Sequence, residues 1–253
     1  MECEVSKFYK PKQSANTLFR FFTKKEYLFN VIKNSALNPR YYVENVEYLN
    51  IERKKVAYPM ICFCDINLHK ISGHIDFYGK YGIAFSKEWG KMKGIQPIQY
   101  INPNSILSKD FSEVFNDGLK KQSCENKGYD FLVSRMGYFK PIEGKMDRGI
   151  KEEYRVFTDE KEWRYIANVE QYDLFQVLDE ENLHLLDFMN QTIEYNKNMW
   201  LNFEYEDIKY IILENEDDFL DLIEIIDNIE MTQNIRDRII SRVILWDEER
   251  WDF

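Results

Sequence analysis

Residues 208–229 read IKYIILENEDDFLDLIEIIDNI, and this stretch decides the fold class. Ile208 to Leu213 is a short apolar run, which predicts a buried strand. Asp217 to Ile229 follows almost at once and predicts an amphipathic helix, because its apolar residues recur at the i, i+3, i+4, i+7 spacing: Phe219, Leu222, Ile223 and Ile226. Strand and helix therefore belong to the same unit of structure.

The same patterns continue outward from this stretch. The predicted strands are Met60 to Cys64, Tyr81 to Phe85, Ile95 to Ile101 with Pro97 at a sheet edge, Trp163 to Ala167, and Val243 to Trp246. The predicted helices are Leu18 to Ile32 with Thr23 as a cap, Phe111 to Lys121, Phe131 to Phe139, and a final one capped by Thr232. The opening of the first helix, Thr17 to Thr23, also has the pattern of a short strand entering a helix. Strands and helices mix without steady alternation, which favours an α+β fold over a doubly wound sheet.

The chain has 253 residues without a repeat, a low-complexity tract or a break in composition. Residues 1–253 are therefore predicted to form a single domain, in which residues 1–16 are an irregular N-terminal segment. The 16% aromatic content is enough to build a sizeable core.

The net charge of −10 limits the range of partners. A net-acidic chain repels nucleic acid and anionic lipid, so extended nucleic-acid binding is not expected. No run of about 18 apolar residues predicts a transmembrane helix. The N-terminus lacks the pattern of a signal peptide, and four cysteines do not make a disulfide framework, so we expect a reduced, cytoplasmic protein.

Two ligand-binding patterns come close and are rejected. Residues 137–146 contain two glycines, the second followed directly by a lysine, but the glycines are too far apart for a phosphate loop and Met146 stands where a Ser or Thr is needed. Cys62 and Cys64 share one face of a strand, with His69 and His74 close in sequence. Zinc knuckles usually place two residues between the cysteines, and buried strand cysteines are common without metal, so no metal site is predicted.

Nucleophilic catalysis has little support, since the chain has three histidines and no G-x-S-x-G motif. His184 lies in an apolar run and is predicted to be a core histidine.

Three segments carry the best constellation of polar and aromatic side chains: residues 17–23, 76–85 and 159–165. Each would place such a side chain at the edge of a strand. Glu160 and Glu162 are two residues apart, so they share one face if their segment is extended.

Together with other parts of the chain, these segments resemble the AbiGi family of bacterial abortive-infection (phage-resistance) proteins. The resemblance spans nearly the whole chain and rests on Leu18 to Arg40, Cys62-Phe63-Cys64-Asp65-Ile66, Phe77 to Trp89, Lys140-Pro141-x-x-Gly144-Lys145-Met146, Glu162-Trp163-Arg164-Tyr165 and Asp252-Phe253. It implies anti-phage defence from an abortive-infection operon. Members are labelled antitoxins and are encoded beside a nucleotidyltransferase-like toxin, so the resemblance implies a cognate toxin or antitoxin as partner.

The same pattern of segments is similar to ADP-ribosyltransferase folds, which implies split mixed β-sheets with flanking helices. It also implies NAD as substrate and a macromolecular acceptor. By this resemblance Arg20 would hold a ribose hydroxyl or phosphate, and Tyr81, or alternatively Ser86, would contact the nicotinamide. Glu162 would bond the ribose 2′-hydroxyl, and Glu160 would help to deprotonate the acceptor.

The chain departs from that pattern because it has no Ser-Thr-Ser element, so an inactive or repurposed scaffold stays open. Simpler interpretations also stand beside the catalytic roles: Arg20 pairs with a surface carboxylate, Tyr81 belongs to the core, and Glu160 and Glu162 balance neighbouring cations on a solvated strand. If the catalytic interpretation holds, Glu162→Ala abolishes turnover and leaves thermal unfolding nearly unchanged.

The stretch from Glu204 to Glu230 holds eleven carboxylates and a single lysine. It predicts either a binding surface for a basic toxin or the solvated face of a helix. Two functions therefore follow from the sequence: an NAD-consuming defence enzyme, and an antitoxin that binds its partner directly.

Overall fold

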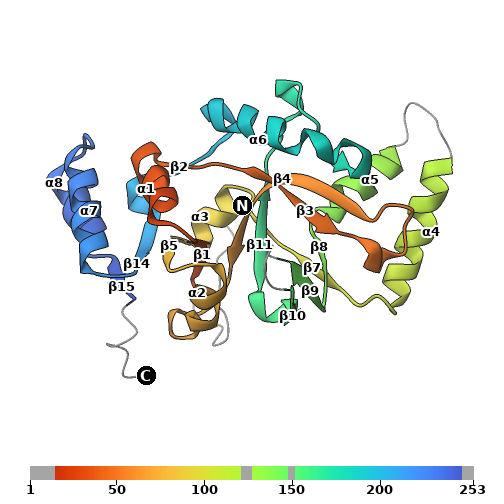
Figure 1. Ribbon diagram of the computed structural model, residues 1–253, viewed down its shortest axis with the longest axis horizontal. Helices are drawn as coiled ribbons and strands as arrows, with labels where there is room; N and C mark the ends of the chain where they lie inside the picture. The colour runs from red at the N-terminus through yellow and green to blue at the C-terminus, as the bar shows by residue number, and fades with distance from the viewer. Residues whose placement is uncertain (1–14, 121–126, 148–151, 247–253) are drawn as a thin grey trace, which may run out of the picture.

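The computed structural model describes residues 15–120, 127–147 and 152–246 (Figure 1). Its main sheet has nine strands. Seven follow the order β15 (Val243–Leu245), β14 (Ile208–Leu213), β5 (Tyr81–Ser86), β1 (Thr17–Phe22), β4 (Lys55–Cys64), β11 (Glu162–Ile166) and β6 (Gln96–Pro97), and β3 (Arg40–Asn45) and β12 (Leu178–Asp179) pair with β4. In this sheet β14 and β15 pair in parallel and the other pairs are antiparallel. The predicted α+β class with mixed sheets is confirmed.

The long strand β4 holds the two halves of this sheet together. Met60 pairs with Arg40 of β3 on one edge and with Ile166 of β11 on the other. Farther along, Cys64 pairs with Phe19 of β1 and with Glu162 of β11. Strands β1 and β3 therefore share one edge of β4 and leave a gap between them.

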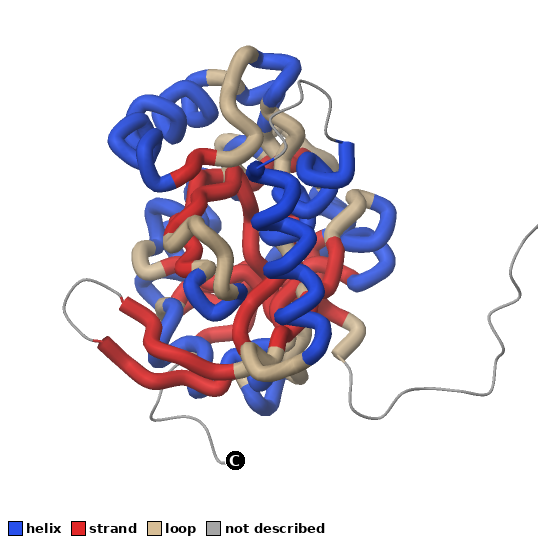
Figure 2. Tube along the Cα trace, turned by 90° about the vertical axis from the view of Figure 1, so that its right-hand side faces the viewer, coloured by secondary structure: helices blue, strands red, loops and turns tan. Residues whose placement is uncertain are grey.

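Three small two-stranded sheets complete the β structure: β2 (Ala36–Leu37) with β13 (Leu201–Asn202), β7 (Gln99–Ile101) with β8 (Phe139–Pro141), and β9 (Glu143–Asp147) with β10 (Glu152–Val156). The antiparallel pair β9–β10 extends away from the body of the molecule, as Figure 2 shows at the lower left.

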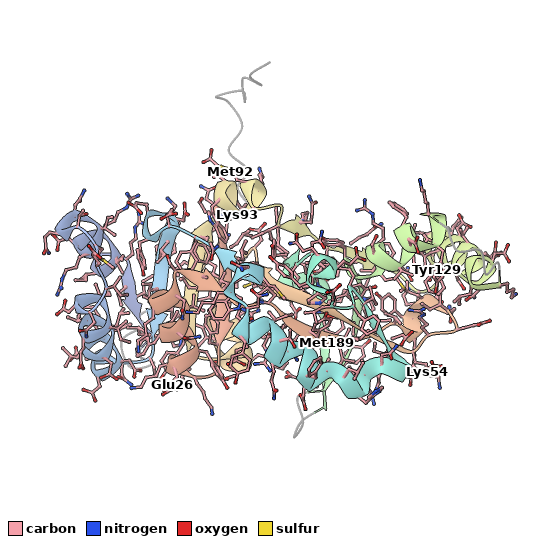
Figure 3. All side chains as sticks on the ribbon, turned by 90° about the horizontal axis from the view of Figure 1, so that it is seen from above. Glu26, Lys54, Met92, Lys93, Tyr129 and Met189 are labelled. Carbon is pink, nitrogen blue, oxygen red and sulfur yellow. The ribbon has the colours of Figure 1, made fainter. Side chains whose placement is uncertain are left out.

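Eight α-helices occur in the described residues: α1 (Lys25–Asn34), α2 (Ser72–Tyr78), α3 (Lys87–Met92), α4 (Ile106–Lys120), α5 (Lys127–Met136), α6 (Leu186–Tyr195), α7 (Glu216–Asp227) and α8 (Gln233–Ile240). Helices α7 and α8 lie at one end of the molecule and α4 and α5 at the other (Figure 1). Seen from above, Glu26 of α1, Met189 of α6 and Tyr129 of α5 follow one another along its length (Figure 3). None of the helices in the described part of the chain has the length and apolar character needed to span a bilayer.

The largest core cluster joins one face of the sheet to α1, α3 and α7, with Leu28, Ile83, Trp89 and Leu222 among its buried members. A separate cluster on the other face includes Phe19, Ile75 and Ile212. The sheet is therefore covered on both faces.

The predicted helix from Leu18 is wrong in its first part. Residues Thr17–Phe22 form β1, which pairs along its whole length with β5, and α1 begins only at Lys25. Leu18 and Phe19 are both buried, in core clusters on opposite faces of the sheet, as strand alternation requires. Thr23 is not the cap either, since Lys24 occupies that position without a side-chain hydrogen bond.

Candidate functional site

Lys140 joins the two predicted catalytic glutamates. Its ammonium group lies 2.9 Å from Glu160 Oε2 and 2.8 Å from Glu162 Oε2, and all three side chains are buried. Lys140 is the middle residue of β8, whereas Glu162 is the first residue of β11. β8 therefore brings one cation to two carboxylates that lie about 20 residues farther along the chain.

Arg164 extends this cluster along β11. It is fully buried, and its Nε donates to Glu162 Oε1 at 2.6 Å. Its two terminal nitrogens donate to the carbonyl of Gly137 at 2.8 Å and to Glu44 Oε1 at 2.9 Å. Arg164 and Glu162 share a face of β11 because they are two residues apart. Both oxygens of Glu162 are thus bound by cations.

The pKa values in the cluster follow from this pairing. Burial alone would raise the pKa of Glu162, but Arg164 and Lys140 outweigh it and hold the pKa far below its usual range. Burial would lower the pKa of Lys140, and Glu162 and Glu160 instead raise it. Glu44 differs, because burial raises its pKa and Arg164 offsets this only in part. Glu162 is therefore ionised in the fold.

Glu160 reaches the cluster by a different local conformation from the one predicted. It ends a 3₁₀ turn (Phe157–Glu160), and Lys161 then has a φ of 44° before β11 begins. The two glutamates are therefore not neighbours on one extended strand. They converge because Lys161 turns the chain between them.

The second carboxylate oxygen of Glu160 contacts groups other than Lys140. The hydroxyl of Tyr78 donates to its Oε1 at 2.5 Å, and Arg155 Nε lies 3.6 Å from the same oxygen. Arg155 in turn lies over the ring of Phe77, with 3.7 Å between its guanidinium carbon and the ring centroid. The cluster therefore contains three cations and three carboxylates. The cations are Lys140, Arg155 and Arg164, and the carboxylates are Glu44, Glu160 and Glu162.

A cavity of about 550 Å³ opens beside Glu160, between α2 and β10. This volume is within the range of roughly 300–1,000 Å³ typical of ligand sites. Its walls include Asp76, Phe77, Glu153, Arg155, Asp159 and Glu160. Of the two predicted catalytic residues, Glu160 lines this cavity and Glu162 does not.

Arg20 lies at the gap between β1 and β3. Its guanidinium donates to the Cys62 carbonyl at 3.2 Å and to the Tyr42 hydroxyl at 2.9 Å. Burial would lower its pKa, yet Tyr42 and other neighbours, Glu162 among them, raise it. The structure thus brings Arg20 within electrostatic reach of Glu162. Its side-chain nitrogens bond a backbone carbonyl and a tyrosine, where the simpler interpretation expected a surface carboxylate.

Tyr81 and Ser86 lie elsewhere. The Tyr81 hydroxyl donates to Glu214 at 3.0 Å and to Asp218 at 3.1 Å, beside α7, and its ring belongs to the main core cluster. Strands β1 and β4 separate its strand, β5, from β11. Ser86 accepts a hydrogen bond from the Trp89 backbone N–H at 3.1 Å and caps α3. The structure does not bring either side chain to Glu162.

The cysteine and histidine patterns have structural explanations. Within the described residues, no group of three or more His, Cys, Asp or Glu side chains could hold a metal ion. Cys62 and Cys64 do share one face of β4, where burial raises the pKa of both thiols. The prediction of a core position for His184 is wrong, because this side chain is exposed and contacts the Glu181 carbonyl.

The acidic C-terminal stretch has both internal and solvated members. Asp218 is buried and bonded to Lys25 at 2.8 Å, and Asp221 binds the same lysine at 2.7 Å. Asp217 and Glu224 are exposed. Part of this charge therefore fastens α7 to α1, and the rest forms a solvated helix face.

Sequence reasoning missed the roles of Lys140, Glu44 and Tyr78. Lys140 was visible only as part of the Lys140-Pro141 segment of the family resemblance. No local pattern could show that these three side chains meet Glu160 and Arg164, because the contacts join residues 20 to 120 positions apart.

Comparisons with known proteins are consistent with the resemblance seen in the sequence. The family model described as "Putative abortive phage resistance protein AbiGi, antitoxin" matches residues 35–214, a range that contains Glu44, Lys140, Glu160, Glu162 and Arg164. The chain is 33% identical over 248 residues to "Abortive phage resistance protein AbiGi" of Lactococcus lactis subsp. cremoris, an alignment that covers 86% of this chain and 100% of the relative. No solved structure matches the chain.

Proposed function

Because this chain belongs to the AbiGi family, we propose that it is an anti-phage abortive-infection protein that acts as an antitoxin by binding a partner toxin. The family description supplies the antitoxin role, and the name of the lactococcal relative supplies phage resistance. One observation favours binding over catalysis. Arg164 and Lys140 bind the two oxygens of Glu162, and this buried carboxylate does not line the cavity, so it is not placed to bond the ribose of a nucleotide there.

The charge of the cavity supports the same choice. An enzyme that uses NAD has to bind the two negative charges of its pyrophosphate. Here Asp76, Glu153, Asp159 and Glu160 line the cavity, and Arg155 is its main cation. These carboxylates repel the negative charge of a phosphate ligand and attract the positive charge of a basic partner.

Co-expression tests the antitoxin proposal. The chain would be produced with the protein encoded beside it, with an affinity tag on that neighbour. We expect the two proteins to co-purify in a fixed ratio, and we expect the chain to relieve growth arrest by the neighbour. Absence of a complex, together with growth arrest by the chain alone, would contradict the proposal.

The second candidate function is ADP-ribosyl transfer from NAD to a macromolecule. Glu160 favours it, because this carboxylate lines a cavity together with Arg155 and the aromatic ring of Phe77. Purified protein would be incubated with labelled NAD and a cell lysate, beside Glu160→Gln. Transfer of label by the wild type and not by the variant would establish the enzyme. If neither folded protein transfers label, the antitoxin function stands alone.

A further inference from the structure

The cavity beside Glu160 continues along a strand edge. Four consecutive residues of β10, Glu153 to Val156, line it together with Gly73, His74 and other residues of α2. Successive side chains of a strand point to opposite faces, so a wall made of four in a row is the edge of the strand. β10 pairs with β9, and no other strand in the described part of the chain pairs with it. Such an edge can add an extended segment of another chain.

The charge of this groove selects the ligand. Asp76 and Asp159 are exposed, and within residues 15–120, 127–147 and 152–246 neither takes part in an ion pair. Glu153 contacts Arg155 only at 3.7 Å. Carboxylates without a partner at the rim of a cavity attract a cationic group that donates several hydrogen bonds.

His74 points to the same kind of ligand. Its side chain lines the cavity and is only 8% exposed, and its Nε2 has no hydrogen-bond partner among the described residues. Burial lowers the pKa of His74, which keeps the imidazole neutral at physiological pH. A neutral imidazole can accept a hydrogen bond from an N–H donor. Buried polar groups usually have a partner, and a donor of the bound segment would supply it once the side chains that cover Nε2 move aside.

We propose that the groove between α2 and the free edge of β10 binds an extended segment of a partner protein, with an arginine side chain of that segment in the cavity. The segment adds to β10, and the guanidinium lies between Asp76 and Asp159. Arginine fits better than lysine because its planar fork reaches two carboxylates at once and stacks on aromatic rings, here the exposed ring of Tyr154. This inference rests on the proposed antitoxin function, whose toxin would carry the segment.

A short peptide tests the ligand class without the toxin. The probe is a blocked pentapeptide, Thr-Val-Arg-Val-Thr, and its matched control carries citrulline, which has nearly the same shape without the charge, in place of arginine. Titration would be followed by backbone amide NMR. We expect shifts concentrated in residues 73–77 and 153–156, and binding at least about tenfold weaker with citrulline. Equal binding of the two peptides would overturn the inference.

Variants locate the site. Asp76→Asn combined with Asp159→Asn should weaken binding of the arginine peptide by about tenfold, since both carboxylates are removed without loss of volume. Asp217→Asn combined with Glu224→Gln removes the same charge from the exposed face of α7 and should leave binding unchanged. An equal effect of the two pairs would show that net charge, and not the groove, controls binding. All four side chains are exposed, so thermal unfolding should be unaffected.

The complex with the toxin separates this inference from the function. If the neighbour co-purifies and the Asp76→Asn, Asp159→Asn variant binds it as tightly as the wild type, the groove inference fails and the antitoxin stands. If no complex forms and the arginine peptide still binds more tightly than the citrulline peptide, the antitoxin proposal fails. The inference that the groove binds an arginine-containing segment then stands.

Discussion

At the scale of single residues, the Glu162 carboxylate is a structural group as much as a candidate catalytic one. Glu162→Ala would leave Arg164 and Lys140 buried beside an empty position. Removal of one partner from a buried ion pair typically costs about 3–5 kcal/mol. We therefore expect Glu162→Ala to lower the free energy of unfolding by about this amount, measured by urea denaturation.

This outcome replaces the expectation from sequence that Glu162→Ala leaves unfolding nearly unchanged. Asp217→Ala on the exposed face of α7 is the matched control and should change the free energy of unfolding by no more than about 0.5 kcal/mol. Similar urea midpoints for the two variants would show that the buried cluster does not stabilise the fold.

The lowered pKa of Glu162 also predicts a pH dependence. A carboxylate with a folded-state pKa below its unfolded value, near 4.3, stabilises the fold above that pH and loses this contribution as the pH falls further. Glu44 acts in the opposite direction, since its folded-state pKa is raised. We expect the wild type to lose more stability than Glu162→Gln as the pH is lowered below about 4.3. Parallel pH profiles of the unfolding free energy would contradict this.

At the scale of elements, Ser86 ends β5 and begins α3. Its hydroxyl accepts from the Trp89 N–H, so Ser86→Ala should cost about 1 kcal/mol of stability. Ser86→Asp should retain most of that stability, because aspartate also caps helices. Thermal unfolding of the two variants measures the difference. A cofactor-binding serine would instead leave unfolding unchanged and affect only ligand binding.

The elements that could be predicted are those whose evidence is local. β14 and α7 carry their patterns within residues 208–229, and Thr232 stands directly before the helix that it caps. β1 was partly taken for a helix because its partner β5 lies far away in the sequence, as the pairing of Thr17 with Ser86 shows. The same distance in sequence hid the candidate site. Glu160 and Glu162 were visible as a pair, but the lysine between them comes from β8.

At the scale of the whole molecule, the net charge of −10 should govern the encounter with the proposed partner toxin if the surface of that toxin is basic. Attraction between opposite charges acts over a long range and accelerates association, and dissolved salt screens this attraction. We expect the association rate constant of the complex to fall as salt is added, with a smaller change in the dissociation rate constant. Surface plasmon resonance at several salt concentrations measures both. An association rate that does not depend on salt would mean that the toxin surface is not basic.

The gap along one edge of β4 has a consequence for how the molecule comes apart. β15, β14, β5 and β1 meet the remaining strands of the nine-stranded sheet only through β4, and near the gap Arg20 bonds the Cys62 carbonyl. The two halves stay joined only while β1 and β4 remain paired, and β4 is also paired with β3, β11 and β12. The amide hydrogens of β4 should therefore be the slowest in the chain to exchange with deuterium, at the rate of global unfolding.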